Sequence, residues 1–137
     1  MRSLVVALLL ALSTAAMAEG TSAGYETGGR YVRFDPVVSQ YNQSGEPFRI
    51  DGVCKSACTL FLSIRNVCIG PNATLFFHAG HDRARNITAS ATQHMLNAYN
   101  ARLRSYVMAN HYMDTLEFHA ISGSDMIHKF GYRACPK

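Results

Sequence analysis

The four cysteines of this chain constrain its fold more than any other feature. Cys54, Cys58 and Cys68 lie close together in the sequence, whereas Cys135 lies near the C-terminus. In an exported chain an even number of cysteines indicates disulfides, which small exported domains use to supplement a thin hydrophobic core. Three pairings are open, and the clustering favours at least one local bridge, with Cys135 tying down the C-terminus. The alternative is a zinc site, although Cys-x3-Cys is not the usual spacing of paired zinc ligands.

The N-terminal segment has the three parts of a cleavable signal peptide. Arg2 supplies positive charge, residues 4–12 form an apolar run, and residues 16–18 (Ala-Met-Ala) offer a cleavage site before Glu19. The apolar run is shorter than the roughly 20 residues that span a bilayer core, and no later stretch approaches that length. We therefore predict that residues 1–18 are a signal peptide and that the protein is exported, either periplasmic or secreted, with no membrane span after cleavage. The alternatives are a buried N-terminal helix or a retained anchor.

The composition is that of a globular domain: 48% of the residues are hydrophobic, 16% are charged, and the formal net charge is +4. Nucleic-acid binding calls for a basic stripe with interleaved aromatic residues. The positive residues are instead scattered, so nucleic acid is not an expected partner. The one loose basic group consists of Arg83, Arg85, Arg102 and Arg104. We expect residues 19–27 to be a flexible leader and residues 28–137 to form a single domain.

Predicted strands and helices alternate along the chain, which indicates an α/β fold: compact, layered, with a short and mostly parallel sheet flanked by helices. Asp35-Pro36 is typical of a helix start, and Ser44-Gly45 of its end. The expected strands cover residues 48–53, 67–69 and 74–78. Residues 59–64 are apolar and predict a short buried helix, and residues 80–85 predict an exposed loop.

The second half of the chain predicts further helices. Ser90 and Gln93 form a capping box that opens an amphipathic helix reaching Asn110. Asp114 and Glu117 form a second box that predicts a short helix. A third short helix is expected from residue 124 to residue 131, where a glycine ends it.

Three features of the chain occur in an order that could support hydrolytic chemistry. Gly28-Gly29 can let the backbone approach a ligand closely, Ser56 lies at a predicted strand-to-helix junction, and His78 ends the next strand. Ser56 could act as a nucleophile that His78 activates as a base. The backbone N–H of Ala57, with one from the glycine pair, could stabilise an oxyanion.

Each of these residues also has an ordinary structural interpretation. Ser56 could simply cap the following helix, a role that serine often has. His78 could be a strand-end histidine that bonds to a backbone carbonyl, and Gly28-Gly29 could be a plain turn. His78 and His81 form a His-x-x-His pair that could hold a metal with a cysteine, but in a loop such a pair is usually coincidental.

At these residues the chain resembles the Clp-type serine peptidase and crotonase superfamily, and in particular its small exported members with a Cys-x-Ser-Ala-Cys-Thr segment like residues 54–59. The resemblance covers residues 28–131, with its specific part at 52–78. It implies a compact, truncated Clp/crotonase-like fold in which the strand before the glycine loop is reduced to a few residues or absent. The matching segments are Thr27-Gly28-Gly29, Ser56-Ala57-Cys58 and Phe77-His78.

The resemblance also implies an acidic residue that orients the catalytic histidine. Aligning Phe130-Gly131 with the end of the family's domain places His119 near that position, where this chain has no carboxylate. The neighbouring acids that could substitute are Asp114, Glu117 and Asp125. A serine and histidine without an orienting acid can lose much of their rate, because the acid sets the imidazole tautomer.

Two functions follow as hypotheses. The first is an exported serine hydrolase, expected to be a peptidase that acts on a peptide or protein by acyl transfer without a cofactor or metal. The second is a catalytically inactive Clp/crotonase-like binding protein of the cell envelope, stabilised by disulfides. Relatives of this fold often form rings or trimers, so a homo-oligomer is a further expectation.

Overall fold

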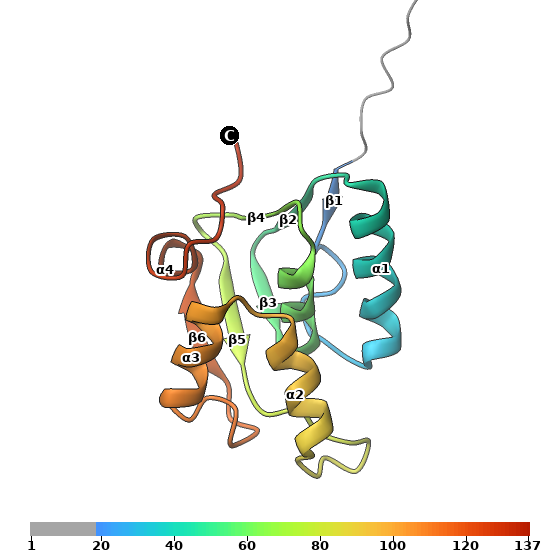
Figure 1. The fold of residues 1–137 in the computed structure, drawn as a ribbon, viewed down its shortest axis with the longest axis vertical. Helices are drawn as coiled ribbons and strands as arrows, with labels where there is room; N and C mark the ends of the chain where they lie inside the picture. The colour runs from blue at the N-terminus through green and yellow to red at the C-terminus, as the bar shows by residue number, and fades with distance from the viewer. Residues whose placement is uncertain (1–18) are drawn as a thin grey trace, which may run out of the picture.

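The computed structural model describes residues 19–137; the predicted signal peptide, residues 1–18, lies outside the described residues. Within the described part, six short strands form two sheets (Figure 1). One sheet is entirely parallel and consists, in spatial order, of β1 (Gly20–Thr21), β2 (Phe48–Ile50) and β4 (Val67–Ile69). The other consists of β3 (Val53–Lys55), β5 (Thr74–Phe77) and β6 (His119–Ser122). In this second sheet β3 and β5 are parallel, whereas β6 is antiparallel to β5.

Helices pack around both sheets. In chain order the described residues form α1 (Tyr31–Ser44), the 3₁₀ helix η1 (Ser56–Ser63), α2 (Ala89–Asn97), α3 (Ala101–Ala109) and α4 (Gly123–His128). In Figure 1, α1 lies beside β1 on one side of the molecule, and α3 and α4 lie near β6 on the other. The structure therefore confirms an α/β fold whose strand pairs are mostly parallel.

The same two chain segments run through both sheets. The predicted strand 48–53 is divided into β2 and β3 by a bend at Asp51-Gly52, where Gly52 has a φ of +60°. The second segment bends between β4 and β5. Ile50 pairs with Ile69 before the bends and Val53 with Thr74 after them. The two segments therefore stay neighbours, and β3 and β5 end at the same edge of the second sheet.

Apolar spacing accounts for α1, but its start differs from the prediction. Phe34 is fully buried, and the partly buried side chains that follow at helical spacing are Val37, Val38 and Tyr41. The helix begins at Tyr31 rather than at Asp35, so Pro36 lies inside it. Asp35 is not the cap, because it lies inside the helix, and its carboxylate accepts a hydrogen bond from His94 Nε2 at 3.0 Å. The predicted end is confirmed: Gly45 follows the helix with a φ of +71°.

The long helix predicted from Ser90 is two helices. Thr88, rather than Ser90, caps α2 by accepting a hydrogen bond from the Ala91 N–H at 3.2 Å. Asn100 then interrupts the helical path, because its Oδ1 accepts from the Leu103 N–H at 2.9 Å and so begins α3. Its Nδ2 donates to the Phe130 carbonyl at 2.7 Å, which fastens the break to the C-terminal segment.

Two further segments differ from the sequence-based expectations. Asp114 and Glu117 do not open a helix; residues 110–117 form turns and bends that lead into β6. The segment expected to be a loose leader contributes β1, and the side chain of Ser22 is fully buried. Its Oγ donates to the Asp51 carbonyl at 3.2 Å and accepts from the Asp51 N–H at 3.1 Å. Polar contacts and strand pairing thus hold this segment against β2.

All four cysteines form disulfides. Cys54 bonds to Cys58 within the predicted local cluster, and Cys68 bonds to Cys135. This confirms the expectation of disulfides and of a bridge to the C-terminus. It also contradicts the zinc alternative, because no thiol is left among these residues to bind a metal.

Candidate functional site

The structure brings Ser56 and His78 to the same edge of the second sheet. Lys55 at the end of β3 pairs in register with Phe76 near the end of β5. Ser56 directly follows β3, and His78 directly follows β5. Because neighbouring parallel strands present their carboxyl ends at one edge, the two side chains line a common pocket of about 590 Å³. Functional sites of α/β proteins commonly lie at this edge.

Ser56 has an unusual backbone conformation. Its φ is +54°, a left-handed value that costs a residue with a Cβ roughly 1–2 kcal/mol. The side chain does not cap η1, which begins at Ser56 itself without a side-chain capping bond. This removes the simplest structural explanation for a serine at the junction. A strained residue at the mouth of a pocket is a common feature of functional sites.

Covalent and hydrogen bonds hold the junction on both sides of Ser56. The Cys54–Cys58 disulfide brackets the serine, and both cysteines are fully buried. The Ser56 carbonyl accepts a hydrogen bond from Thr59 Oγ1 at 2.7 Å, and the same hydroxyl lies 2.7 Å from the buried Tyr99 hydroxyl. These contacts over-determine the backbone at Ser56 and can therefore maintain its strain.

Gly28 lies directly beside the serine, and Gly29 lines the same pocket. A Cβ added to Gly28 would lie 2.7 Å from the Lys55 carbonyl oxygen and 2.9 Å from the Ser56 Cβ, and the φ of Gly28 is +76°. Only glycine therefore permits this close approach. The Gly28 N–H donates to the Tyr25 carbonyl at 3.1 Å. The Gly28 N–H is therefore not free to bind an oxyanion. The remaining predicted donors are Gly29, which lines the pocket, and Ala57, whose backbone nitrogen would lie 3.2 Å from a Cβ added to Gly28.

The His78 imidazole is largely buried. Its side chain is 5% exposed, its Nδ1 lies 2.5 Å from the Ala79 carbonyl oxygen, and the Phe118 ring packs edge-on at 5.0 Å. A carbonyl can only accept, so Nδ1 carries the proton and Nε2 keeps a free lone pair. Burial lowers the pKa of His78, and electrostatic interaction with the neighbouring His81 and Arg85 lowers it further, against the opposing Ala79 hydrogen bond. The imidazole is therefore neutral near pH 7, as a base must be.

The three candidate orienting acids do not contact His78. Asp114 accepts a hydrogen bond from His111 Nδ1 at 2.7 Å, and Asp125 pairs with Lys129 at 3.1 Å. Glu117 is exposed, with no ion pair among the described residues. The hydrogen-bond partner of His78 Nδ1 is the Ala79 carbonyl, where the family resemblance implied a carboxylate. His119 pairs with Phe77 across β5 and β6, and its ring stacks on Tyr112.

The pocket has lining residues that sequence reasoning did not assign to it. They come from the N-cap and first turn of α1, the loop between β5 and α2, and the residue just before β6. The residues are Arg30, Tyr31, Val32, Asp82, Arg83, Arg85 and Phe118. Spacing could not identify them, because folding brings them together from three separate segments. The loose basic group in the sequence contained two of the three arginines.

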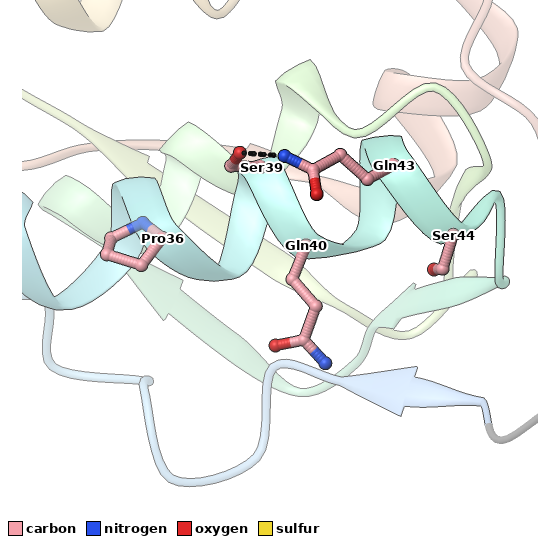
Figure 2. A pocket seen from close by; sticks show the side chains of 5 residues that line it. All are labelled: Pro36, Ser39, Gln40, Gln43 and Ser44. Carbon is pink, nitrogen blue, oxygen red and sulfur yellow. Dashed lines mark hydrogen bonds between the residues drawn. The ribbon is translucent and has the colours of Figure 1, made fainter.

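A second hollow runs along the exposed side of α1 (Figure 2). It is lined by Pro36, Ser39, Gln40, Gln43 and Ser44, and Gln43 Nε2 donates to Ser39 Oγ at 3.1 Å. Amide and hydroxyl groups without a titratable neighbour provide neither base nor acid. This hollow therefore offers no catalytic arrangement.

One histidine–carboxylate pair lies in a third hollow. His94 bonds to Asp35 at 3.0 Å, and the Tyr31 ring stacks on the imidazole at 4.6 Å. The serine hydroxyls of this hollow are occupied: Ser63 donates to the Leu60 carbonyl at 2.7 Å, and Ser39 accepts from Gln43. The pair therefore fastens α2 to α1 and activates no nucleophile there.

No protein-family model matches this chain, and no curated protein matches it. Across residues 19–137, no cluster of three histidine, cysteine or acidic side chains could hold a metal ion. His78 and His81 stack with ring centroids 5.8 Å apart, and each Nδ1 faces a backbone carbonyl. The helices of the same residues include none long and apolar enough to cross a bilayer.

Proposed function

We propose that this protein is an exported serine hydrolase with a truncated Clp/crotonase-like fold, and that it acts on peptides by acyl transfer. The observation that carries the proposal is the strained Ser56, bracketed by a disulfide and placed in one pocket with a neutral His78. Export is supported by the predicted signal peptide and by two disulfides, which persist in oxidising compartments.

The first chemical step is attack by Ser56. As Oγ bonds to the substrate carbonyl carbon, its proton moves to His78 Nε2, and the carbonyl π electrons move to the oxygen. Gly29 and Ala57 are the proposed N–H donors to the resulting oxyanion. When the oxyanion re-forms the carbonyl, the bond to the leaving amine breaks and His78 returns the proton to that amine. Water then repeats the sequence on the acyl-enzyme and releases the acid.

The Ala79 carbonyl replaces the missing acid in this scheme. It accepts a hydrogen bond from the Nδ1–H group and so fixes the tautomer, which is one of the two tasks of a triad carboxylate. A neutral carbonyl stabilises the imidazolium less than a carboxylate does. We therefore expect acylation that is slower than in a complete triad.

The second candidate is an inactive binding domain of the cell envelope, and specific observations favour it. Among residues 19–137 no hydrogen bond joins Ser56 Oγ to the His78 imidazole, and no carboxylate contacts that imidazole. In this case the pocket would bind a ligand without turning it over. Catalytic hydrogen bonds often tighten only when substrate is bound, so geometry without a ligand leaves the choice to experiment.

A fluorophosphonate probe distinguishes the two functions. We expect it to label the purified, oxidised protein at Ser56, as located by peptide mass spectrometry. Ser56→Ala and His78→Ala should abolish labelling, whereas Ser63→Ala in the same helix should keep it. If the folded protein is not labelled, the hydrolase proposal is contradicted and the binding function is favoured.

A further inference from the structure

Three arginines line the pocket from two separate segments of the chain. Arg30 precedes the first turn of α1, and Arg83 and Arg85 lie in the loop between β5 and α2. Within residues 19–137 none of the three side chains takes part in a salt bridge or a hydrogen bond. Three guanidinium groups thus remain available to a ligand, and each can bind a carboxylate through two parallel N–H groups.

Among the described residues, Asp82 is the one acidic residue that lines the pocket, and its carboxylate already forms hydrogen bonds within its own loop. Asp82 Oδ1 accepts from the Asn86 N–H at 2.9 Å, and Oδ2 accepts from Asn86 Nδ2 at 3.3 Å. The Asp82 N–H donates to the Asn86 carbonyl, and the Arg85 N–H to the Asp82 carbonyl. Asp82 therefore shapes the turn that carries Arg83 and Arg85, and its single charge does not balance three arginines.

The positive charge of Arg85 also affects His78, the proposed base. Arg85 and His78 line the same pocket, and the charge of Arg85 contributes to the lowered pKa of His78. Two apolar side chains lie in the same pocket: Val32 is 69% exposed and Phe118 is 47% exposed. The pocket therefore combines uncompensated cations with exposed apolar surface.

We infer that the substrate is an acidic peptide, whose carboxylate binds Arg30, Arg83 and Arg85 while an adjacent apolar side chain contacts Val32 and Phe118. This inference rests on the proposed function, because it takes the pocket as the substrate site. The carboxylate belongs either to an aspartate or glutamate side chain or to the peptide's C-terminus. Both sources present the same chemistry to a guanidinium group.

The test uses one short peptide with leucine next to glutamate, in four forms. Glutamate is kept or replaced by glutamine, and the C-terminus is free or amidated. Binding is measured by titration calorimetry to Ser56→Ala, which prevents turnover. Losing the recognised carboxylate should weaken binding about tenfold or more, the equivalent of one charge-assisted hydrogen bond. The form that loses affinity identifies the source of the carboxylate.

Protein variants show whether the pocket is responsible. In the Ser56→Ala background, Arg85→Gln should weaken binding of the acidic peptide about tenfold, and Arg85→Lys should lose less because it keeps the charge. Arg102→Gln, which removes an exposed arginine from α3, is the matched control and should bind normally. Melting temperatures identify any variant that is not folded, in which case Arg83→Gln is the replacement.

The outcomes separate this inference from the proposed function. If the fluorophosphonate labels Ser56 but all four peptides bind alike, or none binds, the inference is overturned and the hydrolase proposal stands. An equal loss in Arg102→Gln indicates non-specific attraction and also overturns it. If labelling fails but binding depends on Arg85 and the carboxylate, the hydrolase proposal fails and the carboxylate site stands.

Discussion

Ser56 combines a strained backbone with a free side chain. A serine in a left-handed conformation is less stable than a glycine there, and neither capping nor burial of its hydroxyl compensates for the strain. The residue therefore occupies this position at a cost to folding. A cost of this kind is expected where the hydroxyl has a function.

Two substitutions of Ser56 distinguish the effect of its backbone strain on stability from the effect of its hydroxyl on reactivity. Ser56→Ala keeps the Cβ and the strain, whereas Ser56→Gly removes both. We expect Ser56→Gly to be more stable than Ser56→Ala by about 1 kcal/mol, as measured by urea unfolding, and neither variant to react with the fluorophosphonate. Equal stabilities of the two variants would contradict a strained junction.

The protonation state of His78 makes the expected activity of the site depend on pH. The ordinary pKa of histidine is about 6.5, and burial together with the neighbouring His81 and Arg85 lowers it in the folded protein. Only the neutral imidazole accepts the serine proton. Activity should therefore persist as the pH falls past 6.5 and decline only at the lowered pKa.

We predict that Arg85→Gln narrows the pH range over which His78 is neutral and Ser56 is reactive. Removing a positive neighbour raises the pKa of His78 toward its ordinary value, so protonation begins at a higher pH. The acidic limb of the labelling rate, measured between pH 4 and 8, should move upward. Arg102→Gln should leave the profile in place, and an unmoved profile in Arg85→Gln would show that this charge does not reach His78.

At the scale of elements, the glycine loop and the β3–η1 junction fit against each other. Gly28 contacts the junction so closely that no side chain is accommodated, and the Lys55 N–H donates to the Glu26 carbonyl at 2.8 Å. Gly29, the next residue, lines the same pocket as the serine. The site therefore depends on the approach of two backbones as well as on its side chains.

Gly28→Ala tests this approach, with Gly24→Ala as its matched control. Both glycines have positive φ, but a Cβ on Gly24 would meet nothing within 4 Å. We expect Gly24→Ala to cost about 1 kcal/mol for the backbone conformation alone and to keep labelling. Gly28→Ala should cost about 1–3 kcal/mol more for overpacking and lose labelling. Similar results for both variants in unfolding and labelling would contradict the close fit.

At the scale of the whole molecule, the two disulfides have different tasks. Cys68–Cys135 closes a long loop, with a sequence separation of 67, and fastens the C-terminal segment to β4. Cys54–Cys58 closes a loop with a separation of 4, around the proposed nucleophile. Chain entropy therefore assigns most of the global stabilisation to the first bridge and leaves the second to shape the site.

Paired serine substitutions separate these tasks. Replacing Cys68 and Cys135 should lower the free energy of unfolding by about 4 kcal/mol, and replacing Cys54 and Cys58 by about 2 kcal/mol. At a temperature where both variants are folded, only the Cys54/Cys58 variant should lose labelling of Ser56. If both keep labelling, the local bridge does not hold the nucleophile.

The sequence by itself determined the alternation of strands and helices, the presence of disulfides and the order of the glycine pair, Ser56 and His78. Strand and helix patterns repeat within a few residues, so local spacing reports them. The same reasoning misplaced two helix starts, because Asp35 and Ser90 have capping chemistry but Asp35 bonds to His94 and Thr88 caps α2. Capping residues act only where tertiary contacts leave them free.

Only the tertiary structure decided how the site is assembled. Contacts between distant parts of the chain determine the pairing of the cysteines, the break at Asn100, the strand β6 and the placement of Arg30 and Arg85 in one pocket. The partner of His78 was decided in the same way: the family resemblance implied a carboxylate, whereas the folded chain presents the Ala79 carbonyl, in agreement with the alternative interpretation of His78 as a strand-end histidine bonded to the backbone. Such contacts depend on three-dimensional packing, which leaves no periodic trace in the sequence.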